Sequence, residues 1–306
     1  MITTPTVLIL GAGASFPYGF PLGKTLVSSI SNKYVHNTDS DRDLFLAHLS
    51  GAGHSPKTVE EFTQALYYSG KTSVDAFLEI RTKYKEVGKA VMAQFLICHE
   101  DEKLLFTRNE EQGHWYHYLF GLLSGSDLNS YCANQLTILT FNYDRSLDHF
   151  LYTSLTNTYG CSQQECVNAM KSVPIIHLHG QLGNLPWQGS PSRPYAIETK
   201  AANIFTSADG IRIIHESTST DTEFNKARSY LEEAKIICFL GFGYNKNNIE
   251  RLKIEQYLQS KIIIGSAMHL TREEMNKIEG TLLNKDVLKY PDCGNLEFLR
   301  ETGILL

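Results

Sequence analysis

Short apolar runs that stop abruptly at glycine or at polar residues are the feature that most restricts the fold of this chain. They lie at residues 7–10, 136–140, 174–180, 235–240 and 261–264. Strands of a parallel sheet are buried on both faces, so they appear as continuous apolar runs rather than as alternating ones. Because helical patterns separate these runs, the sequence predicts an α/β fold with a Rossmann-like parallel sheet.

A long helical stretch separates the first two runs. Residues 39–124 show no strand alternation, and Ser73 is placed to cap a helix that has Asp75 in its first turn. Apolar residues then recur at spacings of three and four, at Ile80, Tyr84, Val87, Val91 and Phe95, which predicts one face of a long amphipathic helix. We therefore predict a helical insertion subdomain at 39–124 after the first βα unit, with residues 1–38 and 125–306 forming the Rossmann-like domain.

Charge and composition restrict the partners. The 306 residues are 42% hydrophobic and carry a net charge of −5 without a basic run. Direct nucleic-acid binding needs a basic surface that neutralises phosphates, so it is not expected. The N-terminus lacks the pattern of a signal peptide, and no apolar run is long enough to cross a bilayer. We expect a cytoplasmic protein that makes no membrane contact.

The six cysteines lack the spacing of a zinc site. No two are separated by two residues, and only Cys161 and Cys166 lie close together in sequence. This usage predicts reduced, mostly buried thiols and no zinc.

The first apolar run ends in a candidate phosphate-binding loop, Gly11-Ala12-Gly13-Ala14-Ser15. Glycines let a backbone approach a pyrophosphate closely, and a following helix offers its N-terminal amides. The third glycine of the usual dinucleotide motif is replaced by Phe16, and an acidic ribose-binding residue about 20 residues later is missing. An ordinary dehydrogenase site is thereby excluded. The alternative is a glycine turn that binds nothing.

The second run ends in Thr140-Phe141-Asn142-Tyr143-Asp144. An asparagine side chain both donates and accepts hydrogen bonds, and a carboxylate accepts them from amides and hydroxyls. Asn142 and Asp144 would suit a ligand that carries a carboxamide and a ribose. The alternative is that they cap the helix expected from Ser146.

Two histidines, His177 and His179, lie near the end of the third run. Residues two apart on a strand point the same way, so we expect both side chains on one face. A metal site would need a third ligand, which the sequence does not provide. A single catalytic histidine is favoured because imidazole titrates near neutral pH. His179, next to Gly180, is the better candidate, and His177 is interpreted as structural.

Together these motifs resemble sirtuins, and more closely the bacterial SIR2-like domains of anti-phage defence proteins that degrade NAD. The order Gly11–Ser15, Thr140–Asp144, His179-Gly180 and Gly241-Phe242-Gly243 carries the resemblance, which extends to Gly19-Phe20-Pro21 and to residues 73–78. The resemblance implies a sirtuin-type version of the Rossmann-like sheet.

The resemblance also implies roles for individual residues. Gly11, Ala12, Gly13 and Ser15 would hold the pyrophosphate and ribose. Asn142 and Asp144 would face the nicotinamide riboside, and His179 would be the catalytic base. The remaining NAD-binding positions that it implies are Phe20, Asp75, Thr140, Gly241, Gly243, Asn245, Gly265 and Ser266.

Two departures from the sirtuin deacetylases bear on the reaction. Phe141 stands where those enzymes have glutamine, and their four-cysteine zinc module is missing. Both favour hydrolysis of NAD, as substrate, to nicotinamide and ADP-ribose. Two alternatives stay open. One is a module that senses NAD or ADP-ribose without cleaving it. The other is an NAD-dependent protein deacylase that uses the Gly- and Pro-rich residues 181–222, which look like a long loop or lid.

The resemblance further implies an anti-phage effector that depletes NAD under control. We therefore expect a homo-oligomer, or a complex with a defence-system partner of the ATPase/helicase or Argonaute type. Residues 39–124 would offer the surface for such assembly, and the alternative is that they pack against the core.

Overall fold

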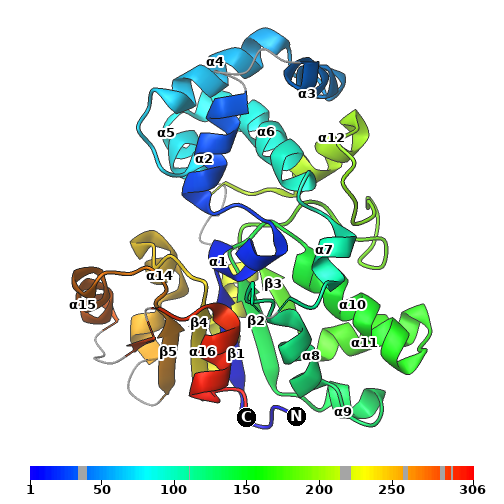
Figure 1. Ribbon diagram of the computed structural model, residues 1–306, viewed down its shortest axis with the longest axis vertical. Helices are drawn as coiled ribbons and strands as arrows, with labels where there is room; N and C mark the ends of the chain where they lie inside the picture. The colour runs from blue at the N-terminus through cyan, green and yellow to red at the C-terminus, as the bar shows by residue number, and fades with distance from the viewer. Residues whose placement is uncertain (34–39, 110, 214–221, 258–260, 283–286, 291) are drawn as a thin grey trace.

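The computed structural model describes residues 1–33, 40–109, 111–213, 222–257, 261–282, 287–290 and 292–306. Its centre is a six-stranded, all-parallel sheet in the order β3-β2-β1-β4-β5-β6 (Figure 1). The strands are β1 (Thr6–Leu10), β2 (Leu136–Thr140), β3 (Ile175–His177), β4 (Ile236–Leu240), β5 (Ile262–Ser266) and β6 (Leu288–Lys289). The predicted α/β fold with a Rossmann-like parallel sheet is confirmed. The two-residue β6 was not predicted.

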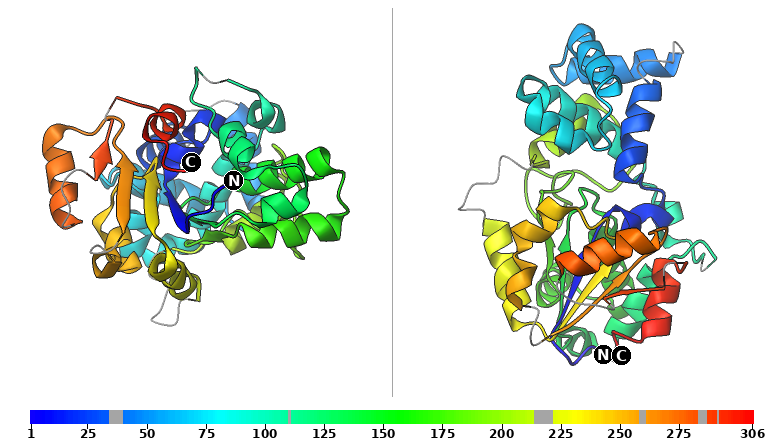
Figure 2. Two further views of the ribbon diagram at one scale, coloured as in Figure 1. Left: turned by 90° about the horizontal axis from the view of Figure 1, so that it is seen from below. Right: turned by 90° about the vertical axis from the view of Figure 1, so that its left-hand side faces the viewer.

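Burial on both faces explains the continuous apolar runs. Leu8 and Leu10 of β1 belong to one hydrophobic cluster, whereas Val7 and Ile9 belong to another. The first cluster includes side chains from α8 (Tyr116–Leu123), α10 (Ser146–Tyr159) and α16 (Asn295–Thr302). The second includes side chains from α13 (Thr222–Glu233) and α14 (Lys246–Leu252). Helices therefore cover both faces of the sheet, as Figure 2 shows.

Between β1 and β2 the described residues form helices and connecting turns without a strand. The elements are α1 (Ala12–Ser15), η1 (Phe16–Tyr18), α2 (Gly23–Ser31), α3 (Ser40–Gly51), α4 (Pro56–Tyr67), α5 (Val74–Ile80), η3 (Thr82–Tyr84), α6 (Lys85–Ile97), α7 (Glu102–Phe106), α8 and α9 (Leu128–Cys132). Helices α2–α6 gather with α12 (Ala201–Gly210) beyond the carboxyl ends of the strands, whereas α8 lies beside the sheet (Figure 1). This helical layer therefore includes residues outside 39–124, and a separate insertion subdomain with those bounds stays a prediction.

The amphipathic segment that begins at Ser73 is not one long helix. Ser73 caps α5 as predicted, accepting a hydrogen bond from the amide of Ala76. Arg81 then leaves the helical conformation, with φ −108° and ψ 60°, and a short 3-10 turn leads into α6. Tyr84 and Val91 are buried as their spacing predicts, but Ile80 is 65% exposed. The periodicity predicts the buried face and misses the break.

The segment predicted as a long loop or lid is anchored over its first part. Arg145 and Arg193 both donate to the Glu100 carboxylate, at 2.8 and 2.6 Å from its Oε2. Arg145 also donates to the carbonyls of Asn184, Arg193 and Pro194. Because Arg145 and Glu100 are completely buried, this network fixes residues 184–194 to the core rather than leaving a lid. The segment also contains α12, and its residues 214–221 lie outside the described part of the chain.

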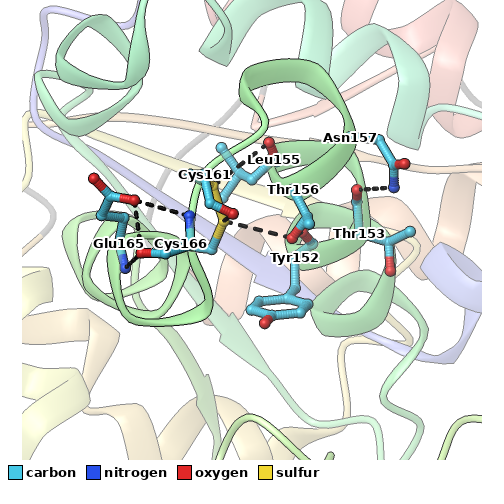
Figure 3. Close-up of a disulfide and its surroundings, with 9 residues drawn as sticks. Tyr152, Thr153, Leu155, Thr156, Asn157, Cys161, Glu165 and Cys166 are labelled. Atoms are coloured by element: carbon cyan, nitrogen blue, oxygen red, sulfur yellow. Dashed lines mark hydrogen bonds between the residues drawn. A yellow bond between two sulfur atoms is a disulfide. The ribbon is translucent and has the colours of Figure 1, made fainter.

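The thiol prediction is wrong for one pair. Cys161 and Cys166 form a disulfide between the end of α10 and the start of α11 (Gln163–Ser172), as Figure 3 shows. The other four cysteines are free, but only Cys238 among them is buried and Cys132 is exposed, so the prediction of mostly buried thiols is also wrong. In the described ranges, no group of three or more His, Cys, Asp or Glu side chains is placed to hold a metal ion. Nor does any helix there combine the length and apolar character needed to cross a membrane.

Candidate functional site

The carboxyl ends of β1, β4 and β5 are joined by backbone contacts. The amide of Gly11 donates to the carbonyl of Leu240 at 3.2 Å, and the amide of Gly13 donates to the carbonyl of Gly241 at 2.9 Å. Gly241 in turn donates to Ser266 Oγ at 2.9 Å. A Cβ on Gly13 would lie 2.9 Å from the Cα of Gly241. The glycines thus serve close packing of two strand-end loops. Since the amide of Ala14 also donates to the carbonyl of Gly11, three amides of the predicted phosphate loop are engaged within the protein.

Replacing Gly241 with alanine should destabilise the fold. Its φ is +57°, and an added Cβ would lie 2.1 Å from the amide nitrogen of Ala14. The left-handed conformation costs about 1–2 kcal/mol and overpacking about 1–3 kcal/mol, so we expect the free energy of unfolding to fall by roughly 2–5 kcal/mol. Chemical denaturation measures the change. Gly243→Ala is the matched control because a Cβ there meets nothing within 4 Å. Equal stability of the two variants would contradict the packing argument.

Asn142 is held on both sides by the ends of neighbouring elements. Its Nδ2 donates to the carbonyl of Gly11 at 2.9 Å and to Ser15 Oγ at 3.0 Å. Its backbone carbonyl lies 3.1 Å from His177 Nδ1, and His177 Nε2 lies 3.0 Å from Asp148 Oδ2. These side chains line a small cavity of about 10 Å³, which Leu10, Leu147 and Ile175 also line. A single water molecule needs about this volume.

Asp144 faces the same cavity but is committed to the start of α10. Its Oδ1 accepts hydrogen bonds from the amide and the hydroxyl of Ser146, and that hydroxyl lies 2.8 Å from the hydroxyl of Tyr116. Burial raises the pKa of Asp144 above its ordinary value, although hydrogen bonds from Ser146 and Ser15 oppose the shift. The helix-capping interpretation therefore describes the contacts of Asp144.

His179 lies on the opposite side of the sheet edge from His177. Strand β3 ends at His177, so the alternation does not continue to His179, and the expectation that both side chains share a face is wrong. The His179 ring instead packs against the rings of Phe141 and Phe224, with centroids 5.4 and 5.9 Å away. His179 is only 6% exposed, and its Nε2 has no hydrogen-bond partner.

Burial and the nearby charge of Arg251 lower the pKa of His179 to about 4, although a side-chain hydrogen bond with Asn248 acts in the opposite direction. The imidazole is therefore neutral at physiological pH. A neutral ring has one nitrogen that can accept a proton. The charge state therefore lets the ring act as a base through Nε2, although a pKa of about 4 makes it a weak base.

Acid should destabilise the protein through His179. Its pKa falls from an ordinary 6.5 to about 4 in the folded chain. Because the folded state binds the proton less tightly, this contribution is complete above pH 6.5 and is lost as the pH falls towards 4. We expect the loss to be about 2–3 kcal/mol at pH 4.5. Urea denaturation at pH 7 and 4.5 should show a smaller acid effect in His179→Gln than in the wild type. An identical effect in both would refute this assignment.

The other predicted residues fall into two groups. Thr140 Oγ1 accepts from the amide of Asn142 at 3.1 Å, and Asp75 on α5 accepts from the hydroxyl of Tyr143. Burial raises the pKa of Asp75. By contrast, Phe20 is a buried core residue and Asn245 caps α14. In the described chain no hydrogen bond or ring contact links Phe20 or Asn245 to Asn142 or His179.

The remaining predicted positions are backbone positions near the edge. Ala12 begins α1, and Gly265 lies in β5, where an added Cβ would be 2.1 Å from the hydroxyl of Tyr244. Asn142 and His179 emerge from neighbouring strands, since Leu178 donates to the carbonyl of Thr140 at 2.9 Å. Their side chains do not contact each other. Sequence reasoning missed Asp148, which lies in α10, four residues after Asp144. Its partner is His177, the histidine that was interpreted as structural.

Comparison with models of known protein families gives no match, and comparison with curated proteins gives no match either.

Proposed function

We propose that this protein hydrolyses NAD to nicotinamide and ADP-ribose at the carboxyl edge of its sheet. The observation that carries the proposal is the unpartnered, buried Nε2 of the neutral His179 at that edge. Buried polar atoms in folded proteins are nearly always hydrogen-bonded, so an exception calls for a water, an ion, a ligand or a catalytic role. The sequence motifs that resemble the SIR2-like domains point to NAD as the ligand.

The topology supports a dinucleotide site. The strand order reverses between β1 and β4, and open α/β sheets bind ligands outside the strand ends at such a reversal. Asn142, Gly241 and Ser266 lie at that point. Because the amides of Gly11, Gly13 and Ala14 already donate within the protein, pyrophosphate binding to this arrangement would use the other amides of the loop.

Hydrolysis of NAD requires few catalytic groups from the protein. Nicotinamide leaves a cationic precursor as a neutral molecule, so no general acid is needed. The ribose that remains has oxocarbenium-ion character, and water must attack it. His179 would accept the proton from that water, directly or through a ribose hydroxyl, and Asn142 would orient ribose and water.

A second candidate is a module that binds NAD or ADP-ribose without cleaving it. It is favoured by the different surroundings of the two central side chains. Asn142 faces the cavity that contains His177 and Asp148, whereas His179 packs among aromatic rings. Protein deacylation has no observation of its own to favour it, because residues 184–194 are fixed by the Arg145 network.

Incubating the purified chain with NAD alone tests the proposal. Free nicotinamide and ADP-ribose in equal amounts support hydrolysis. Binding of an intact dinucleotide supports the sensing module, and turnover only after addition of an acylated peptide supports deacylation. An anti-phage role, with control by self-assembly or by an ATPase/helicase or Argonaute partner, belongs to the same proposal. Loss of NAD in infected cells that express the chain, but not in uninfected ones, tests that role.

A further inference from the structure

Both ring nitrogens of His177 face an acceptor oxygen, one of a backbone carbonyl and the other of a carboxylate. Nδ1 lies 3.1 Å from the carbonyl of Asn142, and Nε2 lies 3.0 Å from a carboxylate oxygen of Asp148. A neutral imidazole carries one N–H and can satisfy one of these acceptors, whereas an imidazolium satisfies both. The side chains of His177 and Asp148 are only 8% and 4% exposed, so bulk water does not readily replace a lost bond, and the adjoining cavity has room for one water molecule at most.

We propose that His177 is a buried imidazolium that, paired with Asp148, positions Asn142 in the site. This inference rests on the proposed function for its kinetic consequences, but the protonation state can be measured without it. Asn142 is held at two points, its side-chain amide by Gly11 and Ser15 and its carbonyl by His177. Loss of the second point frees the backbone that aims the first. His177 is thus a positioning residue that acts through Asn142.

The surroundings favour the charged ring. Burial lowers the pKa of His177, but the charge and hydrogen bond of Asp148, the carbonyl of Asn142 and the charge of Asp144 together raise it above its ordinary value. Other groups around the pair are neutral or engaged elsewhere. Tyr116 hydrogen-bonds to Ser146, and Arg145 is bound to Glu100.

Asp148 is itself fixed by the anchored segment. Its Oδ1 accepts from Gln188 Nε2 at 3.2 Å, and Gln188 Oε1 accepts from the amide of Leu185 at 2.8 Å and from Gln181 Nε2 at 2.9 Å. A continuous polar chain therefore runs from residues 181–188 through Asp148 and His177 to Asn142. When Asp148 is a carboxylate, each link has a donor facing an acceptor if His177 carries two protons.

The experiment compares wild type with Asp148→Asn by ¹⁵N NMR of the histidine rings and of the Asn142 side-chain amide. In the wild type at pH 7 both nitrogens of His177 should show protonated shifts. Asp148→Asn should make one nitrogen unprotonated and shift the Asn142 signal. Glu102→Gln is the matched control. This substitution changes a similar carboxylate contact, between Glu102 of α7 and His149 of α10, which is 3.1 Å long but more exposed. It should leave the Asn142 signal unchanged.

Kinetics provide the second readout. Asp148→Asn should lower kcat for nicotinamide release about 100-fold, as misplacement of a positioned group does, with KM little changed. Because His177 loses its second proton as the pH rises, wild-type activity should fall at high pH. In the Asp148→Asn variant this fall should occur at lower pH. An unprotonated ring nitrogen in wild type at pH 7, or an unmoved Asn142 signal in the variant, overturns the inference. A wild-type chain that releases no nicotinamide refutes the proposed function instead, and the NMR result still decides the state of His177.

Discussion

Glu100→Gln should lower the free energy of unfolding by about 3–5 kcal/mol, the cost of removing one partner from a buried ion pair. The carboxylate is completely buried and receives hydrogen bonds from Arg145 and Arg193. Glutamine keeps the shape but leaves two buried guanidinium groups without a counter-charge. Chemical denaturation followed by circular dichroism measures the change.

Glu102→Gln is the control for this prediction. Glu102 lies two residues further along, its side chain is 60% exposed, and its partner is His149. Exposed pairs of this kind contribute about 0–1 kcal/mol. A Glu100 variant that loses no more stability than the Glu102 variant would show that the network does not hold residues 184–194 in place.

His179→Ala should reduce nicotinamide release by about 10²–10⁴-fold, the usual contribution of a general base. The ring is neutral, and its Nε2 has no partner within the protein. The substitution removes the proton acceptor, while the strand ends that surround Gly241 are retained. Release is measured with NAD alone at pH 7.5, and the melting temperature confirms that the variant is folded.

His149→Ala is the comparison for this loss. His149 is also a histidine of lowered pKa, but it lies on α10 against Tyr195 and Glu102 rather than at the strand ends. Its activity should stay within about threefold of wild type, because it touches none of the reacting groups. A folded His179→Ala chain with near-normal release would exclude His179 as the base.

The sheet could be predicted because its strands are buried on both faces. Residues such as Val7 and Leu8 are apolar in succession, and that pattern needs no information about distant contacts. Strand β6 has only two residues and therefore no run to detect. The break at Arg81 was missed because the apolar spacing continues across it into Tyr84 and Val87.

The site was predictable only in outline. Polar residues that follow strands must meet at one edge, which is why Asn142 and His179 could be named. Their side-chain directions depend on where β3 stops, which the sequence does not reveal. The partner of His177 is Asp148, 29 residues earlier, and the partner of Gly13 is Gly241. Such pairings arise from tertiary packing, so a glycine motif typical of phosphate binding also serves contact between loops.

Tyr143 lies between Asn142 and Asp144 in the sequence, and its hydroxyl donates a hydrogen bond to Asp75 of α5. The helical layer beyond the strand ends is therefore tethered to the tripeptide that shapes the cavity (Figure 1). A displacement of α5 would therefore move Tyr143 and, through the backbone, Asn142 and Asp144. Through this contact, movement of the helical layer would change the position of the site residues at the strand ends.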